Sequence, residues 1–225
     1  MYTHIFFDAD DTLLDFKKGQ LLSFKTVLEG YDIPFSDDLY ITYSKINYDL
    51  WQQLEQGAIT RAELQSKRFS SFFASIGQSI SGDEAELAYK QYLGEQSCLM
   101  PFAEEVCREL SRKYTLTIVT NGISEIQNRR FAACAILPYL TNIVISDDIG
   151  ISKPDKRFFK HALAVSQCKD PSEVLLVGDS LAADIKGANN TGLDACWYNP
   201  EGVSLPDSYR VKYIISDLRE LLDIL

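Results

Sequence analysis

The hydrophobic positions of this chain form three patterns that follow one another along the sequence. A short apolar run at residues 5–7 is broken at once by acidic residues. From residue 16 to about residue 97 the apolar residues recur at helical spacing, for example Leu64, Phe69, Phe72, Phe73 and Ile76. From residue 102 onward, short apolar runs alternate with helical stretches. This order predicts one strand, then a helical block, and then an alternating α/β region.

The apolar runs predict six buried strands. They lie at residues 5–7, 116–119, 143–145, 174–177, 195–197 and 213–215. Helices are expected between the later strands, near residues 124–134, 155–166 and 182–191, with Gly192 as a left-handed cap after the last. Strands that are apolar throughout and separated by helices are typical of a parallel sheet covered on both faces. The expected fold class is therefore α/β: a Rossmann-like parallel sheet, helices on both faces and an inserted helical cap domain.

The position of the helical block determines the expected domains. A chain of 225 residues allows one or two domains, at about 150 residues each. Because the first strand belongs to the same sheet as the later ones, residues 1–15 and 98–225 are expected to form the α/β core and residues 16–97 the cap. Within the cap, Thr60 with Glu63 and Ser81 with Glu84 have the spacing of capping boxes, which predicts two helix starts.

Composition and charge exclude several classes of protein. Apolar residues make up 46% of the chain and charged residues 24%, the balance of a folded globular protein. No apolar run approaches the roughly 18 residues that span a bilayer, and no signal peptide is visible, so no membrane partner is expected. The net charge of −10 disfavours binding to nucleic acid. The five widely spaced cysteines are expected to be free thiols in a reducing cytoplasm.

Polar groups stand where several predicted strands end. They are Asp8-Ala9-Asp10-Asp11-Thr12 after the first strand, Thr120-Asn121-Gly122 after the second, Lys153-Pro154 before a helix, and Gly178-Asp179-Ser180 with Asp184 after the fourth. Each group alone is typical of a turn or a helix cap. Ligands of open parallel sheets bind beyond the carboxyl ends of the strands, so all four groups should face one crevice. Their coincidence in one chain favours a functional site.

The residue types at these strand ends indicate phosphoryl transfer. Asp8, Asp10 and Asp179 would converge, and like charges held close together need a cation among them. Oxygen ligands without histidine or cysteine select a hard ion such as Mg²⁺. Lys153 and the hydroxyl of Thr120 supply the positive charge and the hydrogen-bond donor that a phosphoryl group requires. One aspartate could attack phosphorus, and a second could protonate the leaving oxygen and later activate water.

At these residues the sequence resembles the haloacid dehalogenase superfamily of phosphohydrolases, whose four motifs match in order. The resemblance implies that Asp8 is the nucleophile and Asp10 the general acid and base. It also implies that Mg²⁺ is held by Asp8, by the backbone carbonyl of Asp10 and by Asp179. The dehalogenase branch lacks an equivalent of Asp10, so this residue argues against dehalogenation.

The same resemblance assigns the phosphate-binding and supporting residues. Thr120, Lys153 and the backbone N–H of Asn121 would hold the phosphate. Thr12, Ser180 and Asp184 would lie in the layer of residues around these groups and hold them in place. Asp184 would order a metal-bound water or Lys153. The helical block lies where this superfamily inserts a helical cap.

A closer resemblance is to the bacterial house-cleaning pyrimidine 5′-nucleotidases. It is carried by the sequences around Asp8 and Asp179, by Trp51 followed by Gly57-Ala58-Ile59-Thr60, by Arg68-Phe69, and by Cys196-Trp197-Tyr198-Asn199. It implies a nucleoside 5′-monophosphate substrate. Asn47, Trp51 and Arg68 are then candidates for contact with the base, whereas Phe69, Phe72 and Phe73 are expected to fill the core of the cap.

Three readings of the function stay open at this point. The first is a Mg²⁺-dependent phosphomonoesterase acting on nucleotides, and the second is a sugar-phosphate phosphatase or phosphomutase of the same superfamily. The third is a non-catalytic binding domain, which would be expected to lose at least one of Asp8, Asp10, Lys153 or Asp179. The partner is expected to be a small phosphate ester, and the protein a monomer or weak dimer.

Overall fold

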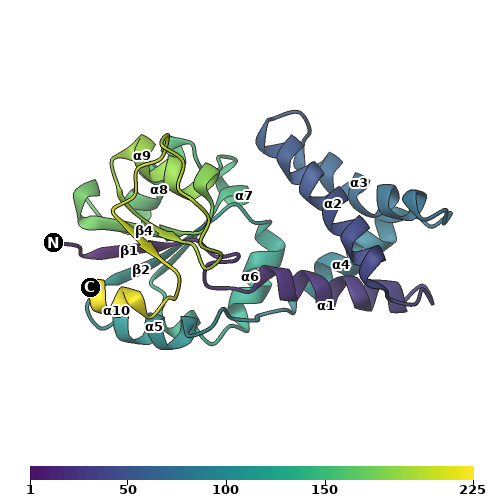
Figure 1. Ribbon diagram of the computed structural model, residues 1–225, viewed down its shortest axis with the longest axis horizontal. Helices are drawn as coiled ribbons and strands as arrows, with labels where there is room; N and C mark the ends of the chain where they lie inside the picture. The colour runs from purple at the N-terminus through teal and green to yellow at the C-terminus, as the bar shows by residue number, and fades with distance from the viewer. The chain divides into compact units, whose positions relative to one another are not determined.

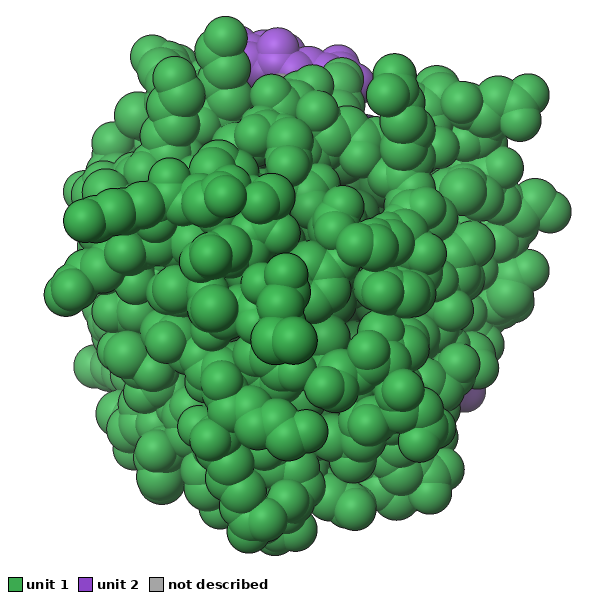
Figure 2. Space-filling model, turned by 90° about the vertical axis from the view of Figure 1, so that its left-hand side faces the viewer, with its two compact units in different colours: residues 1–17, 97–225 green, residues 18–96 purple. Residues whose placement is uncertain are grey.

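The computed structural model describes residues 1–225, with the exception of the side chain of Glu55. It divides into two compact units, which Figure 2 shows in green and purple. Unit 1 comprises Met1–Lys17 and Ser97–Leu225, and unit 2 comprises Lys18–Gln96. The helical cap domain expected from the sequence spans residues 16–97. The role of unit 2 as the cap domain of the α/β core stays a prediction.

Unit 1 is built on a six-stranded sheet in which every strand pair is parallel. The order across the sheet is β3-β2-β1-β4-β5-β6. The strands are β1 (His4–Phe7), β2 (Thr115–Thr120), β3 (Asn142–Ile145), β4 (Val174–Gly178), β5 (Asp194–Tyr198) and β6 (Tyr213–Ile215). The chain builds β2 and β3 on one side of β1 and then crosses to build β4, β5 and β6 on the other. Such a reversal of strand order opens a crevice at the carboxyl ends of the central strands. The α/β fold class expected from the sequence is confirmed.

Alternate residues of the strands enter two hydrophobic cores, one on each face of the sheet. Ile5 and Phe7 of β1 pack in the core that includes Val106 of α5, whereas Phe6 packs in the core that includes Phe158 of α8. Accordingly, α5 (Ala103–Leu110) and α10 (Glu220–Ile224) lie on one side of the sheet, and α8 (Lys156–Val165) and α9 (Lys186–Thr191) on the other (Figure 1).

The remaining helices of unit 1 follow the expected positions with local differences. They are α6 (Ser124–Ala132) and the short α7 (Ser146–Ile149). The single helix expected at 182–191 is instead a π-helical turn, Leu181–Ile185, that continues into α9. Gly192 ends α9 with a φ of 79°, which confirms the left-handed cap.

Unit 2 consists of four helices. They are α1 (Phe16–Glu29), whose first two residues belong to unit 1, α2 (Asp37–Glu55), α3 (Arg61–Ser75) and α4 (Gly82–Gly94). The capping box at Thr60 is confirmed, because its hydroxyl accepts from the Glu63 N–H and the Glu63 carboxylate accepts from the Thr60 N–H. The capping box at Ser81 is wrong, since its side chain makes no bond to the helix. The first residue of α4, Gly82, packs closely against α3. A Cβ at this position would lie only 2.3 Å from the backbone nitrogen of Ser70, so a larger side chain would not fit.

Aromatic side chains form the core of unit 2, as expected for Phe69, Phe72 and Phe73, which are fully buried. Phe24 stacks on Tyr43 with ring centroids 4.5 Å apart. Ile76, expected on the same apolar face, lies at the end of α3 and is partly exposed. Large apolar side chains thus fill most of the interior of the bundle.

Among the described residues all five cysteines are free thiols, in agreement with the sequence prediction. A search of those residues also finds no helix with both the length and the apolar character of a bilayer span.

Candidate active site

The pairing of β1 with β4 brings two aspartates together at the carboxyl edge of the sheet. Asp8 follows β1 directly, and its N–H donates to the carbonyl of Val177 in β4 at 2.9 Å. Asp179 follows β4. After Asp8 the chain turns back on itself: Leu14 N–H donates to the carbonyl of Ala9 at 2.8 Å, and Asp11 adopts a φ of 60°. This turn presents Asp8 and Asp10 to different neighbours.

Three carboxylates and one ammonium form the centre of the site. Asp8, Asp179 and Asp184 each offer an oxygen, and these atoms lie within 4.8 Å of one another. The Lys153 Nζ donates to Asp8 Oδ1 at 2.5 Å, to Asp184 Oδ1 at 2.6 Å and to the carbonyl of Val119 at 2.8 Å. All three N–H donors of this ammonium are therefore used. Asp8, Lys153 and Asp184 are buried.

The electrostatics of this centre favour a divalent cation. Three carboxylates and one ammonium leave two negative charges when all are ionised. Burial raises the pKa of Asp8 well above its ordinary value of 3.8, against the opposing effect of Lys153. Burial, together with the charges of Asp184 and Asp11, raises the pKa of Asp179 from 3.8 to about 7. Crowded carboxylates that resist ionisation, with only oxygen donors, fit a hard ion such as Mg²⁺.

Several uncharged groups hold these carboxylates in place. The buried Thr12 hydroxyl lies 3.3 Å from Asp179 Oδ1 and accepts from the Asp179 N–H at 3.1 Å. The Trp197 Nε1–H donates to the Asp179 carbonyl at 2.8 Å. The Ser180 N–H donates to Asp184 at 3.1 Å. Gly178 is required for this arrangement, because a Cβ there would lie 2.4 Å from Asp184 Oδ2. The expected supporting residues therefore adjoin the carboxylate centre.

The side chain of Asn121 makes two hydrogen bonds to the backbone of Lys153. Its side-chain oxygen accepts from the Lys153 N–H at 2.8 Å, and its amide donates to the Lys153 carbonyl at 3.0 Å. The two strand-end groups, Thr120-Asn121-Gly122 and Lys153-Pro154, are thereby joined. The role predicted for the Asn121 backbone N–H toward phosphate stays a prediction.

The sequence predicts that Asp10 converges with Asp8 and Asp179, but this is wrong for its side chain: the third carboxylate of the centre is Asp184, and the Asp10 carboxylate is bound by side chains of α6. One of its oxygens accepts from Arg130 Nη1, and the other accepts from Gln127 Nε2 at 2.8 Å. The side chain of Asp10 is 28% exposed, whereas that of Arg130 is 1% exposed. The sequence motifs do not single out Gln127 or Arg130. Their spacing of three, on the helix that follows the Thr120 motif, is the one signal that could have suggested a shared face toward the site.

The candidate base-contacting residues belong to unit 2 and differ in exposure. Asn47 is buried and Trp51 is partly exposed. Arg68 is 1% exposed, donates to Glu86 at 3.0 Å and lies 4.9 Å from the ring centre of Tyr89. A guanidinium enclosed in this way would meet a base only if the pair with Glu86 opened. Of the three residues, Trp51 offers the most accessible surface for stacking.

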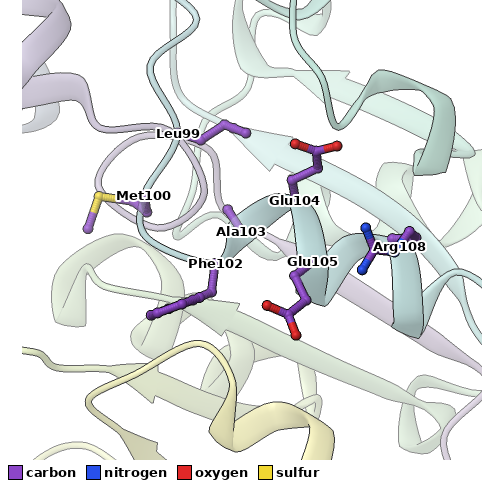
Figure 3. A pocket seen from close by; sticks show the side chains of 7 residues that line it. All are labelled: Leu99, Met100, Phe102, Ala103, Glu104, Glu105 and Arg108. Atoms are coloured by element: carbon purple, nitrogen blue, oxygen red, sulfur yellow. The ribbon is translucent and has the colours of Figure 1, made fainter.

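A separate hollow of about 410 Å³ opens at the start of α5. Figure 3 shows its lining, which is Leu99, Met100, Phe102, Ala103, Glu104, Glu105 and Arg108. None of these side chains belongs to the carboxylate centre. The hollow therefore lies outside the carboxylate centre.

Comparison with known proteins gives consistent results. The model of the haloacid dehalogenase-like hydrolase family matches residues 2–192. The HAD-hydrolase YfnB of Bacillus subtilis is 35% identical over 100% of this chain and 95% of its own. Its crystal structure, described as bound to magnesium, covers 100% of this chain and 98% of that one with a TM-score of 0.94.

Two further relatives are named for their substrates. The pyrimidine 5′-nucleotidase PynA of Streptococcus pneumoniae is 34% identical over 100% of this chain and 95% of its own. The pyrimidine 5′-nucleotidase YjjG of Escherichia coli is 31% identical over 98% of this chain and 96% of its own.

The raised pKa of Asp179 predicts how the stability of the metal-free protein depends on pH. Between about pH 4 and pH 7 the folded state binds the Asp179 proton more tightly than the unfolded state, so the free energy of unfolding falls as pH rises through this window. Above it, added Mg²⁺ should restore stability. Urea unfolding of wild type and Asp179→Asn, in chelator and in Mg²⁺, measures both effects. The variant should lose the part of the pH dependence that Asp179 contributes, while the raised pKa values of Asp8 and Glu86 keep the rest, and it should respond less to Mg²⁺ than the wild type.

Asp207→Asn is the matched control, because it removes the same charge from an exposed position. It should keep the Mg²⁺ response of the wild type. If Mg²⁺ stabilised Asp179→Asn as much as the wild type, Asp179 would not be part of the metal site.

Proposed function

This chain belongs to the haloacid dehalogenase-like hydrolase family, and we propose that it is a Mg²⁺-dependent phosphomonoesterase that hydrolyses pyrimidine nucleoside 5′-monophosphates. The observation that carries the proposal is the buried Lys153 ammonium shared by Asp8 and Asp184 beside Asp179, with Asp10 oriented separately. This arrangement supplies a nucleophile, a cation, a metal-binding set and an independent acid within one crevice.

The residues of the centre suit a magnesium ion. Asp8, Asp179 and the backbone carbonyl of Asp10 would hold it, since these supply oxygen ligands and the negative charge that a divalent ion balances. When bound, the ion would neutralise charge on the phosphoryl oxygens and orient them. The Thr120 hydroxyl would donate to the same oxygens from the protein side, and the Lys153 ammonium would attract them by its charge and donate to them once its bond to Asp8 is released.

In the first step a carboxylate oxygen of Asp8 attacks phosphorus. The new bond joins this oxygen to phosphorus, and the bond from phosphorus to the ester oxygen breaks. Asp10 gives its proton to the departing alkoxide, so that the leaving group departs as an alcohol. The phosphoryl group is then carried by Asp8 as an acyl phosphate.

In the second step a water molecule attacks the phosphorus of this acyl phosphate. Asp10, now a carboxylate, takes the proton of the water. The bond between phosphorus and the Asp8 oxygen breaks, which restores the Asp8 carboxylate and releases inorganic phosphate. Asp10 ends the cycle protonated, as it began.

The nucleotide assignment rests on similarity and on unit 2. PynA and YjjG are named as pyrimidine 5′-nucleotidases and resemble this chain over nearly its whole length. The partly exposed indole of Trp51 offers a plane for stacking, and Asn47 offers an amide for reading a base edge. Arg68 is the third candidate, conditional on release from Glu86.

Asp8→Asn should abolish phosphate release, because an amide cannot attack phosphorus. The fold should remain intact, and the metal-free variant should be as stable as the wild type or slightly more so, since one crowded charge is removed. Asp11→Asn is the control, because it removes a neighbouring charge and Asn tolerates the positive φ at that position. Residual activity above about a few per cent would remove Asp8 from the role of nucleophile.

Asp10→Asn should lower kcat/KM for an alkyl monophosphate by about 10²–10⁴-fold. The loss should be smaller for p-nitrophenyl phosphate, because a leaving group of low pKa needs little protonation. The comparison uses kcat/KM since this ratio reports steps up to departure of the alcohol. Equal losses for the two esters would argue against Asp10 as the acid.

A panel of phosphate esters, assayed for released phosphate with and without Mg²⁺, tests the substrate assignment. Pyrimidine monophosphates should outrank purine monophosphates, and diphosphates and triphosphates should be poor. Trp51→Ala should raise KM for a pyrimidine monophosphate, because base stacking is worth about 1–3 kcal/mol, and should affect p-nitrophenyl phosphate less.

Tyr48→Ala is the control for Trp51, as Tyr48 is an exposed aromatic residue of the same helix, with 62% of its surface accessible. Hexose phosphates that outranked nucleotides would leave the catalytic residues in place but replace the nucleotidase assignment with that of a sugar-phosphate phosphatase.

A further inference from the structure

Two side chains of α6 hold both oxygens of the Asp10 carboxylate. Arg130 Nη1 donates to Oδ1, and Gln127 Nε2 donates to Oδ2 at 2.8 Å. Arg130 also donates to Gln127 Oε1 at 3.1 Å, so the amide oxygen of Gln127 is identified by its partner. With both oxygens bound from one direction, rotation of the Asp10 carboxylate is restricted.

The hydrogen bonds of Thr120 leave its hydroxyl with one remaining function. Its oxygen accepts from Gln127 Nε2 at 3.0 Å and from the Gly122 N–H at 3.1 Å. A hydroxyl has two lone pairs and one hydrogen, so both lone pairs are occupied. Among the described residues Thr120 donates to none. Its hydrogen is thus reserved for an acceptor supplied from outside, such as a phosphoryl oxygen.

The amide of Gln127 is fixed where it makes these contacts. Gln127 and Arg130 are each 1% exposed. A Cβ on Gly122 would lie 2.5 Å from Gln127 Nε2, so only glycine at that position lets the amide pass. The Arg130 guanidinium also lies 5.7 Å from the ring centre of Phe16. Packing on several sides therefore determines the orientation of both side chains.

From this geometry we infer that Gln127 and Arg130 are positioning residues of the phosphoryl-transfer site. Together they hold Asp10 in one orientation for proton transfer, and Gln127 directs the Thr120 hydrogen toward the phosphoryl group. Neither residue reaches the substrate itself. This inference rests on the proposed function, in which Asp10 is the acid and base and Thr120 binds phosphate.

The role is tested with Gln127→Met and Arg130→Met, assayed on an alkyl monophosphate and on p-nitrophenyl phosphate. Each variant should lower kcat/KM for the alkyl ester about tenfold or more, and by no more than the about 10²–10⁴-fold that acid–base catalysis contributes in full. The loss should be smaller for the aryl ester, because its departure depends little on Asp10. Gln127→Met should in addition weaken inhibition by inorganic phosphate, because the Thr120 hydroxyl loses the hydrogen bond that orients its hydrogen.

Combining Arg130→Met with Asp10→Asn separates positioning from structural support. If Arg130 acts through Asp10, adding Arg130→Met to the Asp10→Asn variant should change kcat/KM by no more than about twofold. The two substitutions would then be strongly non-additive. Arg130→Lys retains the charge and should recover part of the activity, which keeps the test valid if Arg130→Met folds poorly. Exposed neighbours on the same helix provide matched controls, Asn128→Met and Arg129→Met, and both should behave as wild type.

Equal losses for alkyl and aryl esters, or full additivity with Asp10→Asn, would overturn the inference while leaving the proposed function intact. A wild-type protein that released phosphate from neither ester would overturn the proposed function, and this inference with it.

Discussion

The Lys153 ammonium donates to Asp8, to Asp184 and to the carbonyl of Val119, at 2.5, 2.6 and 2.8 Å, and these bonds join β1, β2 and the turn after β4. An isolated charge buried this deeply would be strongly unfavourable, and so would the carboxylates without it. The ammonium is therefore both the counter-charge that lets two buried aspartates coexist and the tie between three neighbouring segments. Removing it would leave an uncompensated cluster of negative charge rather than a simple cavity.

One ammonium is nevertheless too little for three carboxylates, and this imbalance connects folding to activity. The raised pKa values of Asp8 and Asp179 reflect burial that their neighbours do not fully offset. Gly178 adds to the imbalance, because it lets the Asp184 carboxylate approach the strand end and the charge of Asp184 raises both pKa values further. A site that is electrostatically unfavourable when empty is well suited to bind a divalent ion and a phosphoryl group in turn.

The sequence was sufficient to predict the sheet and the meeting of Asp8 with Asp179, because both depend on local patterns joined by one rule, whereas it placed Asp10 in this centre where the structure has Asp184. Apolar runs identify the strands, and parallel pairing brings their carboxyl ends to one edge, so Asp8 and Asp179 meet although they lie far apart in the chain. Gln127 and Arg130 could not be predicted in this way. A buried polar residue on a helix is explained only by its partner, and here that partner is Asp10, more than a hundred positions earlier. At Ser81 the predicted helix start is confirmed but the capping bond is absent, and Gly82, the first residue of α4, instead packs closely against the backbone of Ser70 in α3.

The contrast between Asp8 and Asp10 shows how two identical residues, two positions apart, obtain different chemistry. Asp8 continues β1 and faces an ammonium and two further carboxylates, whereas the turn at Asp11 directs Asp10 toward a guanidinium and an amide. In the proposed mechanism Asp8 is the nucleophile, and its fixed, buried position beside the Lys153 ammonium suits that role. The acid and base of that mechanism must reach the leaving oxygen and later a water, and the partial exposure of Asp10 suits the role proposed for it. Both residues are aspartates, so the differences in charge and solvent access come from their surroundings. Exchanging the two proposed roles would therefore require a different turn at Asp11.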